Sequence, residues 1–105
     1  MNTRAVAEEI AERLLRDLPA EEVWLFGSQA RGEANQDSDM DILAIVEESE
    51  MPAYQRVRQA HAVVADIRIP KDIIVLTRDE WRRQEHVVNT LPYIARKEGC
   101  LLNRR

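Results

Sequence analysis

Apolar residues recur at helical spacing near the start of the chain, at Val6, Ile10, Leu14, Leu15 and Leu18. An apolar position every three to four residues is typical of a helix that buries one face. Thr3 can cap the start of such a helix, and Pro19 marks its end. The pattern therefore predicts an amphipathic helix over residues 3–18.

Three short apolar runs predict buried strands, at residues 22–26, 40–46 and 72–76. A helical pattern over residues 52–65 separates the second run from the third. Because parallel neighbours need a long crossover connection, we expect these two strands to be parallel. The shorter connection between the first and second strands leaves their relative direction open.

The C-terminal part of the chain predicts two more helices. Thr77 or Asp79 can cap a helical stretch over residues 80–84, and a second is expected over residues 87–97, with Gly99 at its C-cap. The three residues after this glycine form either a terminal strand or a docked tail. The order of the elements predicts an α/β (α+β) fold, in which helices cover a small mixed sheet.

Composition narrows the class of protein. The 105 residues, 45% of them hydrophobic, fit a single folded domain over residues 1–105. A formal net charge of −4 and a pI near 5.2 argue against direct nucleic-acid binding through overall charge. The lone Cys100 excludes an internal disulfide framework and suits a reducing compartment. Since no apolar run could cross a bilayer and the start is unlike a signal peptide, we expect a cytoplasmic protein without a membrane span.

The segment Asp39-Met40-Asp41 places two carboxylates where a loop enters a predicted strand. Side chains two apart in an extended chain project to the same face, so the two carboxylates would converge and repel each other. Mg²⁺ would compensate this charge, since it prefers oxygen ligands and often binds carboxylates together with substrate phosphates. The simpler interpretation is a solvated turn followed by a charge at the start of a strand.

Asp72 opens the third strand and would lie near the same end of the sheet if the second and third strands are neighbours. Three carboxylates around two divalent cations suit in-line phosphoryl or nucleotidyl transfer. Asp66 is an alternative third acid, and a charge at the edge of a strand is the alternative role for Asp72.

Gly27 and Ser28 end the first strand and lead into a polar turn. Glycine lets the backbone approach a phosphate closely, and exposed N–H groups favour an anion. The hydroxyl of Ser28 and the guanidinium of Arg31 would add donors for phosphate oxygens. Taken alone, a glycine-serine pair is more often a plain turn at the end of a strand.

The segment Gly27-Ser28-Gln29-Ala30-Arg31-Gly32, followed by Ser38-Asp39-Met40-Asp41, resembles the signature of the polymerase-beta-like nucleotidyltransferases. In that signature ten residues separate Gly-Ser from Asp-x-Asp. The likeness extends over roughly residues 23–77 and is closest to the minimal nucleotidyltransferase (MNT) proteins.

The resemblance implies an activity and a set of roles. Gly27 and Ser28 would hold nucleotide phosphates, Asp39 and Asp41 would bind metal ions, and Asp72 would activate the acceptor hydroxyl. The family transfers a nucleoside monophosphate from ATP or another NTP and releases pyrophosphate. Its small members are commonly antitoxins of a helical HEPN-type ribonuclease toxin, and some attach AMP to a tyrosine of that toxin.

The chain differs from larger family members because it has no second helical domain to hold an acceptor. A partner protein or a second copy of the chain would have to complete that side. Two other functions therefore stay open: an antitoxin that neutralises its partner by binding alone, and a module that binds NTP without turnover. The pairs Arg82-Arg83 and Arg104-Arg105 could contact RNA, although solvated charges are the simpler interpretation in an acidic chain.

Overall fold

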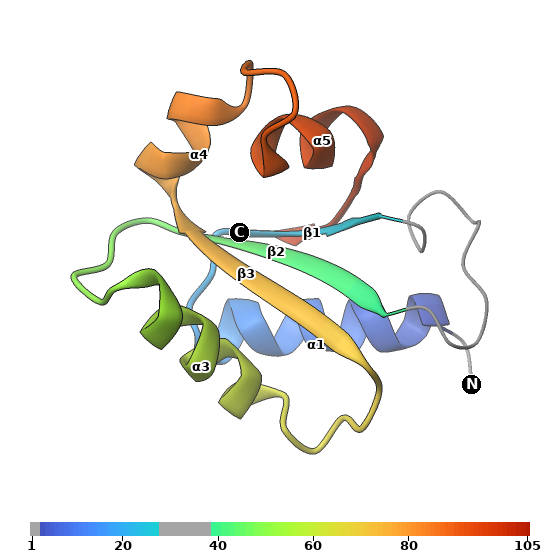
Figure 1. Ribbon diagram of the computed structural model, residues 1–105. Coiled ribbons are helices and arrows are strands. Elements are labelled where there is room, and N and C mark those ends of the chain that lie inside the picture. The colour runs from blue at the N-terminus through green and yellow to red at the C-terminus, as the bar shows by residue number, and fades with distance from the viewer. Residues whose placement is uncertain (1–2, 28–38) are drawn as a thin grey trace.

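One mixed sheet carries helices on both of its faces in the computed structural model, which describes residues 3–27 and 39–105 (Figure 1). The elements in chain order are α1 (Thr3–Asp17), β1 (Glu22–Phe26), β2 (Met40–Val46), α3 (Ala53–Val63), β3 (Lys71–Thr77), α4 (Arg78–Gln84), α5 (Leu91–Glu98) and β4 (Cys100–Arg104). This architecture confirms the predicted α/β class. No helix in the described part of the chain is long and apolar enough to span a membrane.

The strand order in the sheet is β3-β2-β1-β4. β2 and β3 are parallel, as predicted from the helix between them, and β1 runs antiparallel to both β2 and β4. The structure thus supplies the direction of β1 that the sequence left open. It also shows that the segment after Gly99 is a strand, which pairs with β1.

The last helix begins later than the sequence predicts. The expected helix over residues 87–97 starts only at Leu91, because the Thr90 side chain caps it by accepting from the Tyr93 N–H, and Asn89 before it has a φ of 71°. A left-handed residue cannot continue a helix, so the apolar residues at the start of the predicted stretch belong to the preceding turn. Gly99 is the C-cap, as predicted.

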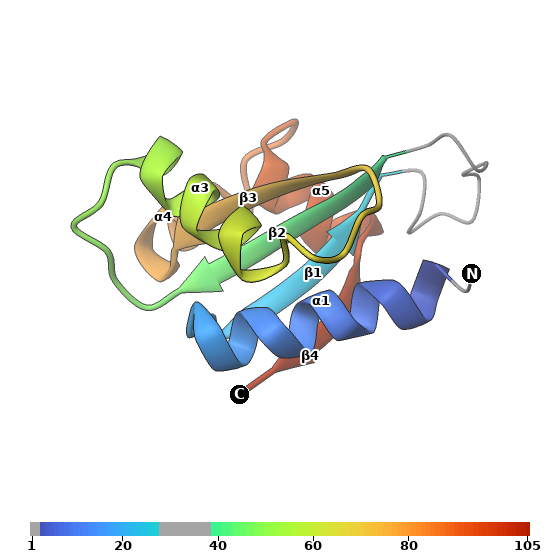
Figure 2. The same ribbon diagram turned by 90° about the horizontal axis from the view of Figure 1, so that it is seen from below.

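Alternation along the strands divides the core into two layers. One face of the sheet packs Ile42 and Ile73 against α1 and α3. The other face packs Leu43 and Ile45 against Trp81 of α4 and Ala95 of α5. Figure 2 shows α1 and α3 lying across the first of these faces. Odd and even positions of β2 therefore face different layers, which decides where its charged residue can point.

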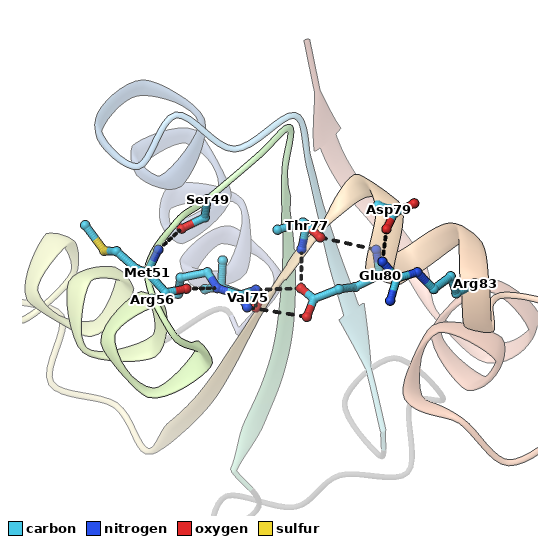
Figure 3. A network of polar contacts seen from close by, with 8 residues as sticks. All are labelled: Ser49, Met51, Arg56, Val75, Thr77, Asp79, Glu80 and Arg83. Atoms are coloured by element: carbon cyan, nitrogen blue, oxygen red, sulfur yellow. Dashed lines mark hydrogen bonds and ion pairs between the residues drawn. The ribbon is translucent and has the colours of Figure 1, made fainter.

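Arg56 of α3 is a buried charge, 7% exposed, and it links three elements (Figure 3). Its Nη1 donates to the Val75 carbonyl of β3 at 2.8 Å and to Glu80 Oε1 of α4 at 2.7 Å. Its Nε donates to the Met51 carbonyl ahead of α3 at 3.2 Å. We call these contacts the Arg56 clasp.

The clasp also completes the cap of α4. Glu80 Oε1 accepts from the Thr77 N–H at 2.8 Å, while the Glu80 N–H donates to Thr77 Oγ1 at 3.2 Å. Such a capping box satisfies backbone donors that a helix start leaves unpaired. The hydrogen bond from Arg56, with help from Thr77, lowers the pKa of Glu80 to about 2. One ion pair therefore fixes the end of β3, the start of α4 and the start of α3.

Removing the clasp is expected to destabilise the fold. Arg56→Met should lower the free energy of unfolding by about 2–3 kcal/mol, because hydrogen bonds to a charged group are lost and their partners stay partly buried. The matched control is Arg58→Met on the exposed side of α3, which should change it by less than about 0.5 kcal/mol. Urea unfolding measures both, and equal effects would contradict the role of the clasp.

The same ion pair predicts a pH dependence. The folded pKa of Glu80 is about 2, below the ordinary value of 4.5, so its stabilisation is complete above pH 4.5 and is lost as pH falls toward 2. Glu80→Gln should remove this part of the acid sensitivity. Urea unfolding at a series of pH values checks this prediction. If the free energy of unfolding of the variant falls with acid as steeply as that of the wild type, other carboxylates cause the acid sensitivity.

Candidate active site

The parallel register places two predicted site residues directly beside each other. Asp41 of β2 pairs with Asp72 of β3, and neighbouring strands lie roughly 4.8 Å apart. Met40 and Ile42, on either side of Asp41, belong to the core against α1 and α3. Because successive side chains of a strand point to opposite faces, the Asp41 side chain points to the other face of the sheet. Farther along the sheet, α4 and α5 cover this face.

Asp39 completes a group of three acids. It lies just before β2, two residues from Asp41, and is exposed, as is Asp72. Asp41 is partly buried. The structure therefore brings the three predicted carboxylates to one end of the sheet, the end where β2 and β3 begin.

The electrostatics of this group show the repulsion that the sequence predicts. Burial raises the pKa of the Asp41 carboxyl above its ordinary value, and the negative charges of Asp72 and Asp39 raise it further. An uncompensated carboxylate in this position is costly, and a divalent cation would remove the cost. The donor set, three carboxylates and no sulfur or imidazole, fits Mg²⁺. Among residues 3–27 and 39–105, no group of three or more Asp, Glu, His or Cys side chains is placed so that it could hold a metal ion by itself. Phosphate oxygens or water would therefore have to supply part of the coordination of an ion beside Asp41.

Gly27 has a structural role beside Asp41 that the sequence did not reveal. Its φ is +74°, a left-handed conformation, and a Cβ built on it would lie 2.3 Å from Asp41 Oδ2. Only a glycine leaves room for the carboxylate here. The sequence signal for this role was a glycine directly after a predicted buried strand. The sequence predicts that this glycine contacts phosphate, and the close approach to Asp41 neither supports nor contradicts this prediction.

The remaining candidates lie elsewhere or outside the described residues. Asp66, the alternative third acid, forms an ion pair with Arg13 of α1, and that hydrogen bond lowers the pKa of Asp66. It is therefore engaged on the α1 side, whereas Asp72 stands next to Asp41. Ser28 and Arg31, predicted to hold phosphates, fall outside the described residues.

A family model described as "Nucleotidyltransferase domain" matches residues 7–95, a range that includes β1, β2 and β3 but not β4. The chain belongs to the nucleotidyltransferase domain family. This assignment agrees with the resemblance carried by the Gly-Ser and Asp-x-Asp segments. A search of curated proteins found no match.

Solved structures share the fold of this nucleotidyltransferase domain. A candidate nucleotidyltransferase from Sulfolobus solfataricus is 32% identical, with a TM-score of 0.70, over 97% of this chain and 80% of that one. A toxin–antitoxin crystallised with AMP-PNP is 19% identical, with a TM-score of 0.57, over 93% of this chain and 73% of that one. The toxin–antitoxin MntA–HpeT, in a double aspartate-to-glutamate variant, is 14% identical, with a TM-score of 0.52, over 94% and 73%.

Neutralising Asp41 is expected to stabilise this nucleotidyltransferase domain. Because the folded pKa is raised, the contribution of this group to stability is complete below pH 3.8 and is lost as pH rises through the folded pKa. Asp41→Asn should therefore raise the melting temperature at pH 7 and change it little at pH 3. The matched control, Asp66→Asn, should lower it slightly at pH 7, since its ion pair is lost. A less stable Asp41→Asn protein at pH 7 would contradict the repulsion.

A double-mutant cycle tests the fit between Gly27 and Asp41. Gly27→Ala should cost the left-handed backbone penalty, about 1–2 kcal/mol, and in addition the clash with the carboxylate. In an Asp41→Ala background the carboxylate is gone, so only the backbone penalty should remain. Urea unfolding of the four proteins gives the coupling energy, and a coupling of zero would show that the two residues do not meet.

Proposed function

We propose that this protein is a Mg²⁺-dependent nucleotidyltransferase that transfers AMP from ATP to a hydroxyl group of a partner protein. The observation that carries the proposal is the register pair Asp41–Asp72, with Asp39 at the same end of the sheet, in a chain of the nucleotidyltransferase family. A transferase of this kind, which belongs to the EC 2.7.7 class, needs several carboxylates at one point to counter the charge of cations and a triphosphate.

The residues divide into two groups by role. Asp39, Asp41 and Asp72 would together hold two divalent cations. Gly27, Ser28 and Arg31 would bind the phosphates. When bound, Mg²⁺ supplies neutralisation of the triphosphate and of the leaving pyrophosphate.

The exposed carboxylate of Asp72 is open to an acceptor. As the acceptor oxygen forms its bond to the α-phosphorus, Asp72 takes the hydroxyl proton, and the bond from that phosphorus to pyrophosphate breaks. Asp41, partly buried and with a raised pKa, holds its charge best when a cation is present, which couples binding of the nucleotide–metal complex to the charge of the site.

The acceptor is proposed to be a HEPN-like helical toxin, which would make this protein its antitoxin. Two structures with the same fold are toxin–antitoxin proteins, one of them holding AMP-PNP. Asp72 is exposed, which is compatible with a hydroxyl presented by a partner chain or by a second copy of this chain.

The proposal predicts transfer of label from α-labelled ATP to the protein encoded by the neighbouring gene, only when Mg²⁺ is present. Asp39→Asn, Asp41→Asn and Asp72→Asn should each abolish transfer, because each removes a carboxylate from the cluster. Asp66→Asn is the matched control and should retain it, since Asp66 is bound to Arg13 away from the site. Circular dichroism confirms that each variant is folded.

Two results would count against the enzyme. Absence of transfer by the folded wild-type protein would falsify it. If an Asp39→Ala/Asp41→Ala protein still protects cells fully from the toxin, the antitoxin acts by binding alone. Tight NTP binding without release of pyrophosphate, with any partner, would instead support a nucleotide-binding module.

A further inference from the structure

A groove of about 400 Å³ lies on the sheet between β1, β4 and the helices α4 and α5, and four of the nine residues that line it are arginines. Arg82 comes from α4, Arg96 from α5 and Arg104 from β4, while Trp24 and Leu101 line its apolar part. We call this the arginine groove. Folding has brought Arg82 and Arg104, one member from each of two arginine pairs, to the same groove, although more than twenty residues separate them in the sequence.

The groove carries a net positive charge in an acidic chain. Two of its lining residues neutralise each other, since Arg78 Nη2 donates to Glu22 Oε2 at 2.9 Å and Arg78 Nε to Glu21 at 3.0 Å. Arg96 Nε donates to the carbonyl of Glu85 at 3.2 Å, and its Nη2 lies 3.3 Å from His86 Nδ1, so neither of these partners is an acid. The ion pairs of this region among the described residues join Arg78 to Glu21 and Glu22 and include neither Arg82 nor Arg104. Glu21, whose pKa is lowered by its hydrogen bond with Glu47 and by the charges of Arg78 and Arg82, is a second acid close to Arg82. With Arg78 paired to Glu22, the lining still holds three arginines and one acid, Glu85.

The apolar part of the groove is rigid. Trp24 stacks on Trp81 with ring centroids 5.6 Å apart, and Trp81 is only 4% exposed. The Trp24 Nε1 donates to Glu22 at 3.0 Å, which fixes the orientation of the indole. Because this surface is already ordered, a ligand would lose little free energy in organising it.

The groove also borders an open edge of the sheet. β4 is an outer strand and, among residues 3–27 and 39–105, pairs with β1 alone. An outer strand presents unpaired N–H and C=O groups at a spacing that an extended peptide can match. Arginine beside such an edge recognises carboxylates, often through two parallel hydrogen bonds.

We propose that the arginine groove and the edge of β4 bind an extended acidic segment of a partner protein. The segment would pair with β4 through its backbone and place Asp or Glu side chains against Arg82 and Arg104. A nucleic acid is the less suitable occupant, because Glu85 lines the groove, the chain has a net charge of −4, and a strand edge matches a peptide backbone. This binding needs neither ATP nor the three aspartates, so it stands apart from nucleotidyl transfer.

Fluorescence anisotropy with a labelled eight-residue peptide that alternates glutamate and threonine tests the proposal. Arg82→Gln/Arg104→Gln should weaken binding about tenfold, as expected when two exposed ion pairs worth up to about 1 kcal/mol each are lost. Arg58→Gln/Arg68→Gln is the matched control, with the same change in net charge at exposed positions on α3 and in the connection from α3 to β3, and should bind like the wild type.

Two further probes separate the alternatives. A peptide with the same sequence and charge, but with a methyl group on every backbone nitrogen, cannot donate hydrogen bonds to β4 and should bind at least tenfold more weakly. A single-stranded oligonucleotide of similar charge should bind more weakly than the acidic peptide. The proposal is overturned if the acidic peptide shows no binding that depends on Arg82 and Arg104, if the N-methylated peptide binds equally well, or if the oligonucleotide binds more tightly.

Discussion

The parallel pairing of β2 with β3 is the constraint on which the rest of the molecule depends. Its register sets Asp41 opposite Asp72 at one end and Val46 opposite Thr77 at the other. A shift of one residue would turn every side chain of β3 to the opposite face and move Asp72 into the apolar layer. The site exists because the buried residues between these ends, such as Ile42 and Ile73, permit a single register.

The two ends of this strand pair have opposite electrostatics. At the Val75–Thr77 end, a buried guanidinium meets a carboxylate, and the attraction fixes α3, β3 and α4 to one another. At the Asp41–Asp72 end, three carboxylates repel. The fold therefore tolerates an unfavourable cluster at the candidate active site and holds the same strands together by an ion pair at their other end. The loss of Arg56 removes a favourable contact, whereas the loss of Asp41 removes a repulsion.

The face of the sheet that carries the aspartates also carries the arginine groove. Asp41 and Trp24 both point toward the layer of α4 and α5, Asp41 near the Phe26 end of β1 and Trp24 nearer its Glu22 end. Phe26, the register partner of Asp41, lies two residues from Trp24, so at roughly 3.4 Å per residue the two positions are about 7 Å apart along β1. A partner held in the groove by an acidic segment would thus lie on the same side of the sheet as the acceptor position beside Asp72.

The sequence alone determined the elements and the residue types of the site. Local patterns suffice for this, since the alternation of apolar residues in 40–46 and the cap at Thr77 depend on neighbours in the chain. Only the tertiary structure decided the direction of β1, the choice of Asp72 over Asp66 as neighbour of Asp41, and the placement of Arg82 and Arg104 in one groove. Each of these depends on contacts between segments far apart in the chain, whose geometry is fixed by register and packing across the sheet.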